Sequence, residues 1–434
     1  MAWDFETDPE FQKKLDWADE FVRERIEPLD LVYRDGGAPY DRKNPVYRKI
    51  TEPLKAEVQK QDLWACHLGP ELGGKGYGQV KLALLNEILG RSYWAPTIFG
   101  CQAPDSGNAE ILAHYGTEAQ KQKYLEPLLR GDIVSCFSMT EPQAGADPKE
   151  FKCAGRKEGN EWVIDGEKYF SSNAELAEFL ITMVVTDPTV PIHQGASMVL
   201  IPRETPGVNI VRRVGLGGEP LGYGHHAYIR YENVRVPEEN LLGGPGQAFA
   251  IAQTRLGGGR IHHAMRTVAM VKQALQMMCE RALSRHTQGE QLARKQMVQQ
   301  YVADSFIQLE QFRLLVLYTA WHIDKGHKSE ARTYIAAVKV QMADVLHDVL
   351  RRAIQVHGAM GCSNELPLMR MWSAAPVMAI ADGPTEVHKV TVARAIFKQY
   401  QPYEGLWPRE FLPAKVEEAK RKLGDAIEQE VQNL

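Results

Sequence analysis

The spacing of apolar residues changes twice along this chain of 434 residues, and no other feature constrains its fold as strongly. Up to about residue 135 the spacing is helical, as in Pro53–Trp64 and Gln79–Arg91. From about residue 247 it is helical again, with apolar residues at steps of three and four: Met265, Val268, Val271, Leu275, Met278 and Ala282, then Val338, Met342, Val345 and Val349. Such stripes predict the core of a helical bundle, with a Met-lined ligand groove as the alternative.

Between these zones the chain has the pattern of β-structure. The segments EWVIDG, EKYFSS, FLITMVV, ASMVLI, GVNIV and HAYIRYENVRV are short, rich in β-branched and aromatic residues, and separated by turns. Closely spaced strands without intervening helices predict a small antiparallel barrel or sandwich. We therefore predict an α+β protein with an N-terminal helical domain (1–135), a middle β-barrel domain (136–246) and a C-terminal helical bundle (247–434).

Charge and cysteine usage limit the classes of function. The formal net charge is −4 and the pI is near 6.4, which argues against nucleic acid or an anionic membrane as a partner. The sequence has no stretch that approaches about 20 unbroken apolar residues, so we do not expect a membrane-spanning helix. The N-terminal segment lacks the basic and apolar regions of a signal peptide. Six scattered cysteines without a CxxC pair indicate a reduced, cytoplasmic chain.

Two patterns resemble ligand sites and are better explained otherwise. The run GLGGEPLGYG (215–224) is followed by a strand-like segment, whereas a dinucleotide-binding loop requires a helix there. We interpret it as a loop between strands. In the pairs His225–His226 and His262–His263, neighbouring side chains on a helix point about 100° apart, unlike the i, i+4 pair of a zinc site. We expect structural or substrate-lining roles for these histidines and no metal.

Three segments carry a specific pattern when they are taken together. They are CFSMTEPQAGADPKEF (136–151), DGEKYFSSNAELAEFLITMVVTD (165–187), and residues 355–394 with QVHGAMG and ADGPTEVH. In this order across a helix–β–helix chain, they resemble the acyl-CoA dehydrogenase family of flavoproteins. The resemblance covers nearly the whole chain and is strongest to the branch with mammalian family members ten and eleven and bacterial relatives. It implies the acyl-CoA dehydrogenase-like fold, with a C-terminal four-helix bundle, and FAD as cofactor.

The resemblance also assigns residues to the two halves of the FAD site. It implies that the following lie near the isoalloxazine ring: Phe137, Met139, Thr140, Gly145, Ala146, Phe170 and Ser172. Ala146 replaces the usual serine, and Phe170 replaces a frequent tryptophan. The adenosine half comes from a neighbouring subunit in the family, which implies a homotetramer or homodimer. Its implied contacts are Arg285, which suits the pyrophosphate, with Gln288, Gln296, Gln355 and Gly358.

Most family members have Glu before Gly where this chain has Asp382, which the resemblance makes the catalytic base. Asp is one methylene shorter, so backbone or substrate must lie roughly 1–1.5 Å closer. Two alternatives are that Asp382 only caps the following helix, or that Glu386, which matches an FAD-contacting Gln, is the base. The implied substrate contacts are Ala146, Arg260, Asp382 and Gly383. Arg260 matches an active-site arginine of the family, and its alternative role is a surface ion pair.

The resemblance implies α,β-dehydrogenation of an acyl-CoA thioester, as in fatty acid β-oxidation. The carboxylate removes the α-proton, flavin N5 takes the β-hydride, and an electron-transfer flavoprotein accepts the electrons. One alternative is a flavin oxidase of a nitroalkane-like carbon acid, which oxygen would reoxidise quickly. Another is a flavin-carrying, DNA-associated relative, which would need a basic C-terminal face, whereas residues 416–432 alternate in sign and indicate a solvated helix.

Overall fold

The computed structural model describes residues 7–33, 37–70 and 74–424. The chain forms two compact units, residues 1–389 and 390–434, which are described separately. The first six residues and the last ten, which include part of the sign-alternating tail, lie outside the described residues.

Helices form the N-terminal part of the first unit. Their bounds are α1 Pro9–Phe21, α2 Glu27–Val32, α3 Pro45–Lys60, α4 Gly78–Leu89, α5 Ala95–Ile98, α6 Asp105–Tyr115, α7 Glu118–Gln120 and α8 Glu126–Arg130. Helix α3 begins earlier than the apolar spacing suggested, because Asn44 accepts a hydrogen bond from the Val46 N–H and Pro45 occupies the first helical position.

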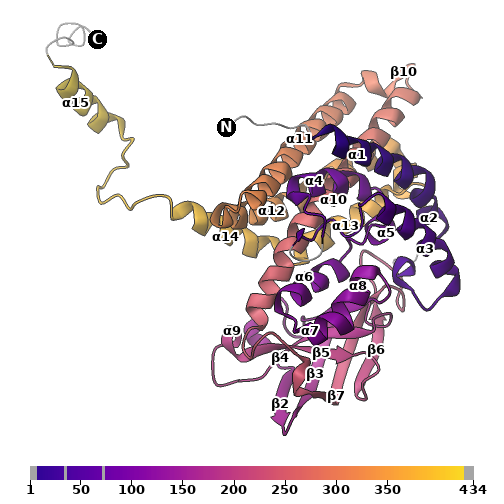
Figure 1. Cartoon of the computed structure of the whole chain (residues 1–434). Helices are drawn as coiled ribbons and strands as arrows, with labels where there is room; N and C mark the ends of the chain where they lie inside the picture. Colours follow the sequence, from indigo (N-terminus) through magenta and orange to yellow (C-terminus); the bar gives the residue numbers. More distant parts are fainter. Residues whose placement is uncertain (1–6, 34–36, 71–73, 425–434) are drawn as a thin grey trace. The chain divides into compact units, whose positions relative to one another are not determined.

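The middle zone forms an eight-stranded sheet (Figure 1). The strands are β1 Ser135–Ser138, β2 Ala154–Glu158, β3 Glu161–Ser172, β4 Phe179–Val185, β5 Ala196–Pro202, β6 Val208–Val214, β7 His226–Pro237 and β8 Leu241–Leu242. A four-residue helix, α9 (Ile192–Gly195), precedes β5. The order is β6-β7-β3-β2-β4-β5-β8, with β1 beside β4. Most pairings are antiparallel, as expected, whereas β1 and β2 run parallel to β4.

The segments EWVIDG and EKYFSS, which looked like two strands, form the single strand β3. Its pairing with β7 shifts register on either side of Gly166. Gly166 has φ +143, and a Cβ there would lie 2.5 Å from the Cα of Cys153. Glycine therefore lets one long strand bend where two strands approach closely.

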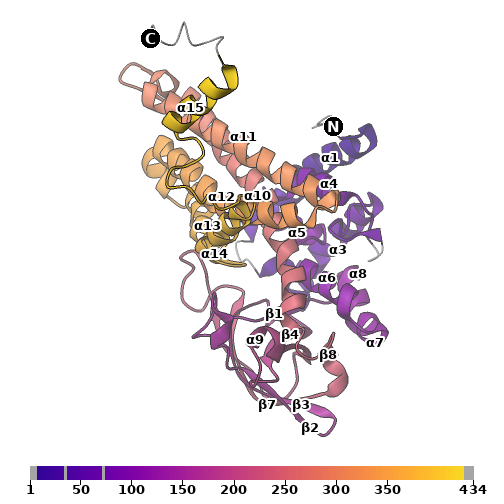
Figure 2. The ribbon, with the colours of Figure 1, turned by 90° about the vertical axis from the view of Figure 1, so that its left-hand side faces the viewer.

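Long helices form the third zone. They are α10 Ala248–Ser284, α11 Gln296–Asp324, α12 Lys328–His357, α13 Leu368–Ile380 and α14 Thr385–Phe397; strands β9 His286–Thr287 and β10 Glu290–Gln291 pair between α10 and α11. Figure 2 shows α10, α11 and α12 side by side. The expected stripes are confirmed as core, because Met265, Val268 and Val271 of α10 and Val338 and Met342 of α12 are buried.

Helix α10 passes from one hydrophobic core to another. Its first turns, with Ala248, Ile251 and Ala252, pack in the core that one face of the sheet shares with α6 and α8. From Ile261 onward it packs in the core that the N-terminal and C-terminal helices share. The predicted division into three domains therefore stays a prediction, since one core joins the first and third zones. The segment between Ala252 and Ile261 lies at the junction of the two cores.

The second unit contains the end of α14 and the helix α15 (Leu412–Leu423). No residue of α15 is buried, and Lys420 and Lys422 pair with glutamates three or four residues away. The described part of the sign-alternating tail is therefore a solvated helix.

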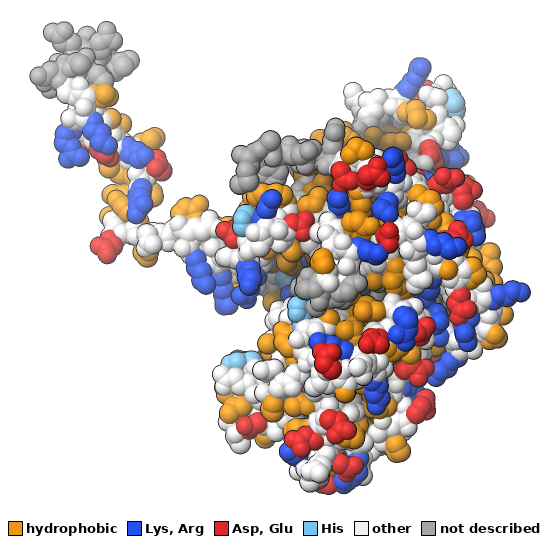
Figure 3. Space-filling view, in the orientation of Figure 1, with side chains coloured by type: hydrophobic (Ala, Val, Ile, Leu, Met, Phe, Trp, Pro, Cys, Tyr) orange, Lys and Arg blue, Asp and Glu red, His pale blue; other side chains and the backbone are white. Residues whose placement is uncertain are grey.

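Neither a membrane-spanning helix nor a metal-binding cluster is found among the described residues. On the face in Figure 3, side chains of both signs are interspersed over the first unit. Among residues 7–33, 37–70 and 74–424, no helix is long and apolar enough to cross a membrane, and no group of three His, Cys, Asp or Glu side chains could hold a metal ion. All six cysteines are free.

Candidate active site

Three consecutive glycines, Gly257–Gly259, lie in the middle of α10 at the junction of the two cores. A glycine in a helix interior costs about 1 kcal/mol relative to alanine, so three together need a reason. A Cβ on Gly258 would lie 3.0 Å from a carboxylate oxygen of Glu110, and a Cβ on Gly259 would lie 3.0 Å from one of Asp382. The two glycines therefore let two carboxyl groups, from Glu110 and from Asp382, come close to the backbone of α10.

The backbone at Asp382 is held in a strained conformation. Its φ is +57, in the left-handed region, which costs free energy unless surrounding contacts impose it. Arg260 Nε donates to the Asp382 carbonyl at 2.8 Å, and His388 Nε2 lies 3.3 Å from the same oxygen. The carboxylate points to α10, with Oδ2 3.8 Å from His263 Nε2. It faces that helix rather than capping α14, so the helix-cap alternative lacks support.

Positively charged side chains surround this carboxylate. Arg255 and Arg260 of α10 and Lys339 of α12 all interact electrostatically with Asp382. Burial lowers the pKa of Lys339 to about 8 and that of His263 to about 4, so His263 is neutral at pH 7. Lys339 also donates to the Met378 carbonyl in α13, which fixes the helix that leads into Asp382.

Arg255 connects Asp382 to the sheet. Its guanidinium carbon lies 3.9 Å from the centroid of the Phe137 ring in β1, and its Nε donates to the Asn108 side chain at 2.9 Å. Arg255 is half-buried, and desolvation lowers its pKa. The guanidinium therefore lies over the first predicted flavin-ring residue and interacts electrostatically with the predicted base.

A buried ion pair joins the two flavin-ring segments of the sheet. Lys168 Nζ lies 2.8 Å from Glu141 Oε1 and donates to the Met139 carbonyl at 2.8 Å. The two side chains are 0% and 2% exposed. The Tyr169 N–H donates to the Thr140 carbonyl at 2.7 Å. Residues 137–141 and 168–172 are thereby fixed to each other.

The remaining predicted ring-side residues are exposed or half-buried, on β3 and on the loop after β1. Phe170 has φ +56 and is 42% exposed, and Ser172 Oγ lies 2.8 Å from His226 Nδ1. Burial lowers the pKa of His226 to about 3, so this histidine is neutral. Gly145 and Ala146 are exposed on the loop after β1.

The residues predicted for the adenosine half are not brought to Asp382 within the chain. Arg285, Gln288 and Gln296 lie exposed around the β9–β10 turn. Arg285 follows Arg260 by 25 residues of α10, or roughly 37 Å along the helix. Gln355 and Gly358, also exposed, lie at the end of α12, roughly 24 Å along it from Lys339. Glu386 is exposed on the first turn of α14.

The sequence reasoning missed three residues at this junction, Glu110, Arg255 and Lys339, whereas it expected a structural or substrate-lining role for His263. Burial raises the pKa of Glu110 to about 7. The three glycines inside a helical pattern were the available sign of a site. Helix periodicity could not show which distant carboxyl group faces them.

Comparison with known proteins agrees with this arrangement. Models of the acyl-CoA dehydrogenase N-terminal, middle and C-terminal domains match residues 8–132, 136–234 and 246–397. The chain is 43% identical to FadE2 of Mycobacterium tuberculosis, with 84% of this chain and 88% of that protein covered. It is 38% identical to mouse acyl-CoA dehydrogenase family member 10, with 90% of this chain covered but only 37% of the mouse protein.

Solved structures show the same fold. An acyl-CoA dehydrogenase structure from Mycobacterium abscessus matches with a TM-score of 0.83 at 36% identity, covering 91% of this chain and all of that one. Butyryl-CoA dehydrogenase from Megasphaera elsdenii matches with a TM-score of 0.77 at 26% identity, with the same coverage. The fold and the junction thus define an FAD-dependent oxidoreductase. The chain belongs to the acyl-CoA dehydrogenase family.

The residues at the junction fit FAD as the cofactor. Within the described part of the chain, the backbone N–H and the hydroxyl of half-buried Thr140 have no hydrogen-bond partner. Such free donors suit the polar edge of a flavin. The half-buried side chains of Phe137 and Met139 supply apolar contact beside them.

Proposed function

We propose that the chain dehydrogenates an acyl-CoA thioester at its α,β-bond, with Asp382 as the base. One observation carries this proposal: Arg255 interacts electrostatically with Asp382, and its guanidinium lies over the ring of Phe137, a predicted flavin-ring residue. A base in contact with substrate must lie beside the group that receives the hydride. When bound, FAD supplies that hydride acceptor.

The chain's own residues then have distinct roles. Asp382 accepts the α-proton on its carboxylate, which the bonds from Arg260 and His388 to its carbonyl hold in place. The Asp382 N–H makes no hydrogen bond within the described residues, so it can donate to the thioester carbonyl as negative charge develops there. Arg255 and Phe137 exclude water from the side facing the sheet. Gly383, with φ +108, leaves room for His388 behind the turn.

The wider setting of the reaction also belongs to this proposal. We assign Arg285, Gln288, Gln296, Gln355 and Gly358 to the adenosine half of the FAD of a second copy, in a homodimer or homotetramer. An electron-transfer flavoprotein is the proposed acceptor, and fatty acid β-oxidation in the cytoplasm is the proposed context. The six free cysteines support a reducing compartment. We also propose that the chain is divided into three domains, 1–135, 136–246 and 247–434.

Anaerobic titration of the purified protein with a panel of acyl-CoA thioesters tests the proposal. We expect bleaching of the flavin absorbance by at least one thioester, with the enoyl-CoA as product. A correctly folded flavoprotein that no thioester reduces would overturn the proposal. Rapid reoxidation of the reduced flavin by oxygen would favour an oxidase instead.

A further inference from the structure

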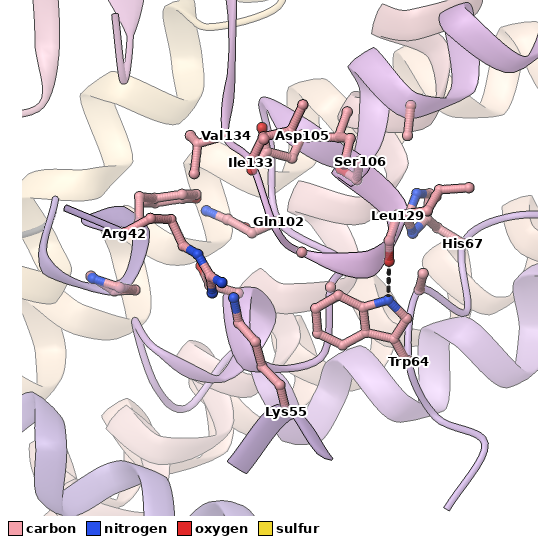
Figure 4. Close-up of a pocket in the computed structure, with 18 residues that line it drawn as sticks. Arg42, Lys55, Trp64, His67, Gln102, Asp105, Ser106, Leu129, Ile133 and Val134 are labelled. Carbon is pink, nitrogen blue, oxygen red and sulfur yellow. Dashed lines mark hydrogen bonds between the residues drawn. The ribbon is translucent and has the colours of Figure 1, made fainter. Parts of the chain in front are cut away.

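A small cavity among the N-terminal helices is balanced in charge. Figure 4 shows it between α3, the segment 64–67, the start of α6 and the loop after α8. Lys55 and Arg42 line it, and the carboxyl groups of Asp105 and Glu52 act on them. Its volume of about 40 Å³ has room for a few waters, since one water needs roughly 10–15 Å³.

A second cavity borders the histidine pair at the start of β7, which the junction at Asp382 does not use. Its volume is about 60 Å³, and it lies between residues 37–41 and the sheet. His226 of this pair lines the cavity and lies opposite Ser172 in the pairing of β7 with β3. Since Ser172 is a predicted flavin-ring residue, His226 contacts the ring side of the FAD site.

The end of β3 is strained at the point where it presents its two ring-side residues. Phe170 has φ +56, in the left-handed region, and its side chain is exposed. The pairing of β3 with β7 shifts register between Lys168 and Ser171. A residue other than glycine keeps such a conformation only where surrounding contacts hold it. A bulge of this kind re-aims the side chains beside it, here those of Phe170 and Ser172.

His226 contacts both of these ring-side residues. Its Nδ1 lies 2.8 Å from the Ser172 hydroxyl oxygen. Its ring makes a hydrogen bond with the Phe170 backbone and an edge contact with the Phe170 ring, with centroids 6.5 Å apart. Burial and the neighbouring His225 lower the pKa of His226 to about 3, so its ring is neutral at pH 7. A neutral imidazole has one N–H donor and one acceptor nitrogen, so its bond with Ser172 determines where the hydroxyl proton points.

The inner face of the same segment is held by other contacts. Ser171 is buried, and its hydroxyl lies 2.9 Å from the Ser138 hydroxyl of β1. The Tyr169 N–H donates to the Thr140 carbonyl at 2.7 Å. These bonds join β3 to the β1 segment, whereas His226 acts on a side chain of the ring side. Loss of the His226 ring should therefore alter the ring side without separating the strands.

We propose that His226 is a positioning residue that acts through the Ser172 hydroxyl on bound FAD and sets its reduction potential. A hydroxyl that donates to a ring nitrogen favours one redox state of a flavin, and a hydroxyl that accepts from a ring N–H favours the other. His226 determines which of these roles the Ser172 hydroxyl takes. This inference rests on the proposed function, in which Ser172 lies at the flavin ring.

The first test is anaerobic redox titration of the FAD-loaded protein against a reference dye, without any thioester. His226→Phe keeps an aromatic ring but loses the bond to Ser172. We expect the ratio of the affinities for oxidised and reduced FAD to change about tenfold, or about 30 mV for two electrons. His226→Asn places an amide atom where Nδ1 lies, so it should keep most of the wild-type potential. His193→Phe, exposed on α9, is the matched control and should leave the potential unchanged.

A double-mutant cycle separates this role from a purely structural one. In a Ser172→Ala background, His226→Phe should cause no further change in potential, because its effect passes through the hydroxyl. Urea unfolding and FAD content of each variant check that it is folded and loaded. His226→Ala replaces His226→Phe in the cycle if the larger ring prevents FAD retention.

Two results would overturn the proposal. One is a wild-type potential in the variants that lack the His226 ring, and the other is an equal shift with and without the Ser172 hydroxyl. Because the titration contains no thioester, it is independent of the proposed dehydrogenation. If no thioester reduces the flavin but the potentials change as predicted, the proposed reaction fails and the role of His226 stands.

Discussion

The two predicted halves of the FAD site differ in how this chain supports them. On the ring side, β1, β3, α10 and the turn at Asp382 meet through Arg255 and the Lys168–Glu141 pair. On the adenosine side, Arg285, Gln296 and Gln355 are exposed at helix ends tens of ångströms along α10 and α12 from that junction.

The half of the predicted FAD site that is packed within one chain, the ring side, is therefore the half that is preorganised. The ring side is held by contacts that the fold itself makes. The adenosine side presents polar groups outward, where a second copy can use them. Substitutions in the two regions should therefore affect different steps.

The largest effect should come from the ring side. Asp382→Asn keeps the size of the side chain but removes the proton acceptor. We expect flavin reduction by substrate to slow by about 10²–10⁴, with FAD content unchanged. Rapid-mixing absorbance measures the rate. Glu386→Gln is the control, and a near-normal Asp382→Asn with an inactive Glu386→Gln would transfer the role of base to Glu386.

Asp382→Glu refines this result. If the strained turn fits a short carboxylate, the added methylene crowds the thioester and lowers the rate. Tolerance of Glu would mean that the backbone is placed as in relatives with Glu.

Removing the lysine of the buried pair should weaken the folded state itself. Lys168→Met leaves Glu141 as an uncompensated buried charge, which costs about 3–5 kcal/mol. Urea unfolding measures the change in free energy. Lys157→Met, in an exposed pair with Glu238, is the matched control and should cost less than about 1 kcal/mol. Equal effects of the two substitutions would mean that the ring-side segments are not held by this pair.

A substitution on the adenosine side should weaken the binding of FAD. Arg285→Ala removes a charge-assisted contact and should weaken FAD binding by about ten- to a hundredfold, or roughly 1.5–3 kcal/mol. Because Arg285 is exposed, unfolding stability of the FAD-free chain should be unchanged. Unaltered FAD affinity on titration would remove Arg285 from the cofactor site.

The smallest expected effect is a pH dependence at the junction. Burial raises the pKa of Glu110 to about 7 from 4.5, so the folded state holds this proton more tightly than the unfolded state. The resulting stability is fully present below pH 4.5 and is lost as pH rises through 7. Glu110→Gln should therefore raise the free energy of unfolding by no more than about 3 kcal/mol at pH 8 and barely change it at pH 4. The same increment at both pH values would show that ionisation of Glu110 is not its cause.

The fold and half of the site could be predicted from the sequence for physical reasons. The spacing of apolar residues reflects which face of each helix or strand is buried. Because this spacing changes near residues 135 and 247, it predicted the order of helices, then a sheet, then helices. The TEP segment and the ADGPTE segment pointed to Phe137 and Asp382 because their residue patterns resemble a family. The parallel β1–β4 pairing and the bend at Gly166 depend on contacts between distant strands, which alternation does not encode.

The parts of the site that escaped prediction share one property. Glu110 faces Gly258, and Lys339 interacts with Asp382, only because α6 and α12 pack against α10 or α13. The spacing of residues along the sequence does not show which distant side chains lie close together in the folded chain.

We propose that each active site combines Asp382 of one chain with Arg285 of another. Hybrids of two variant subunits test this proposal most directly. Asp382→Asn and Arg285→Ala proteins are refolded together and assayed for thioester-dependent flavin reduction at limiting FAD. A hybrid contains a site with an intact Asp382 from one chain and an intact Arg285 from the other. We therefore predict activity well above that of either parent. Activity no higher than the average of the two parents would contradict the account, because both residues would then belong to a site within a single chain.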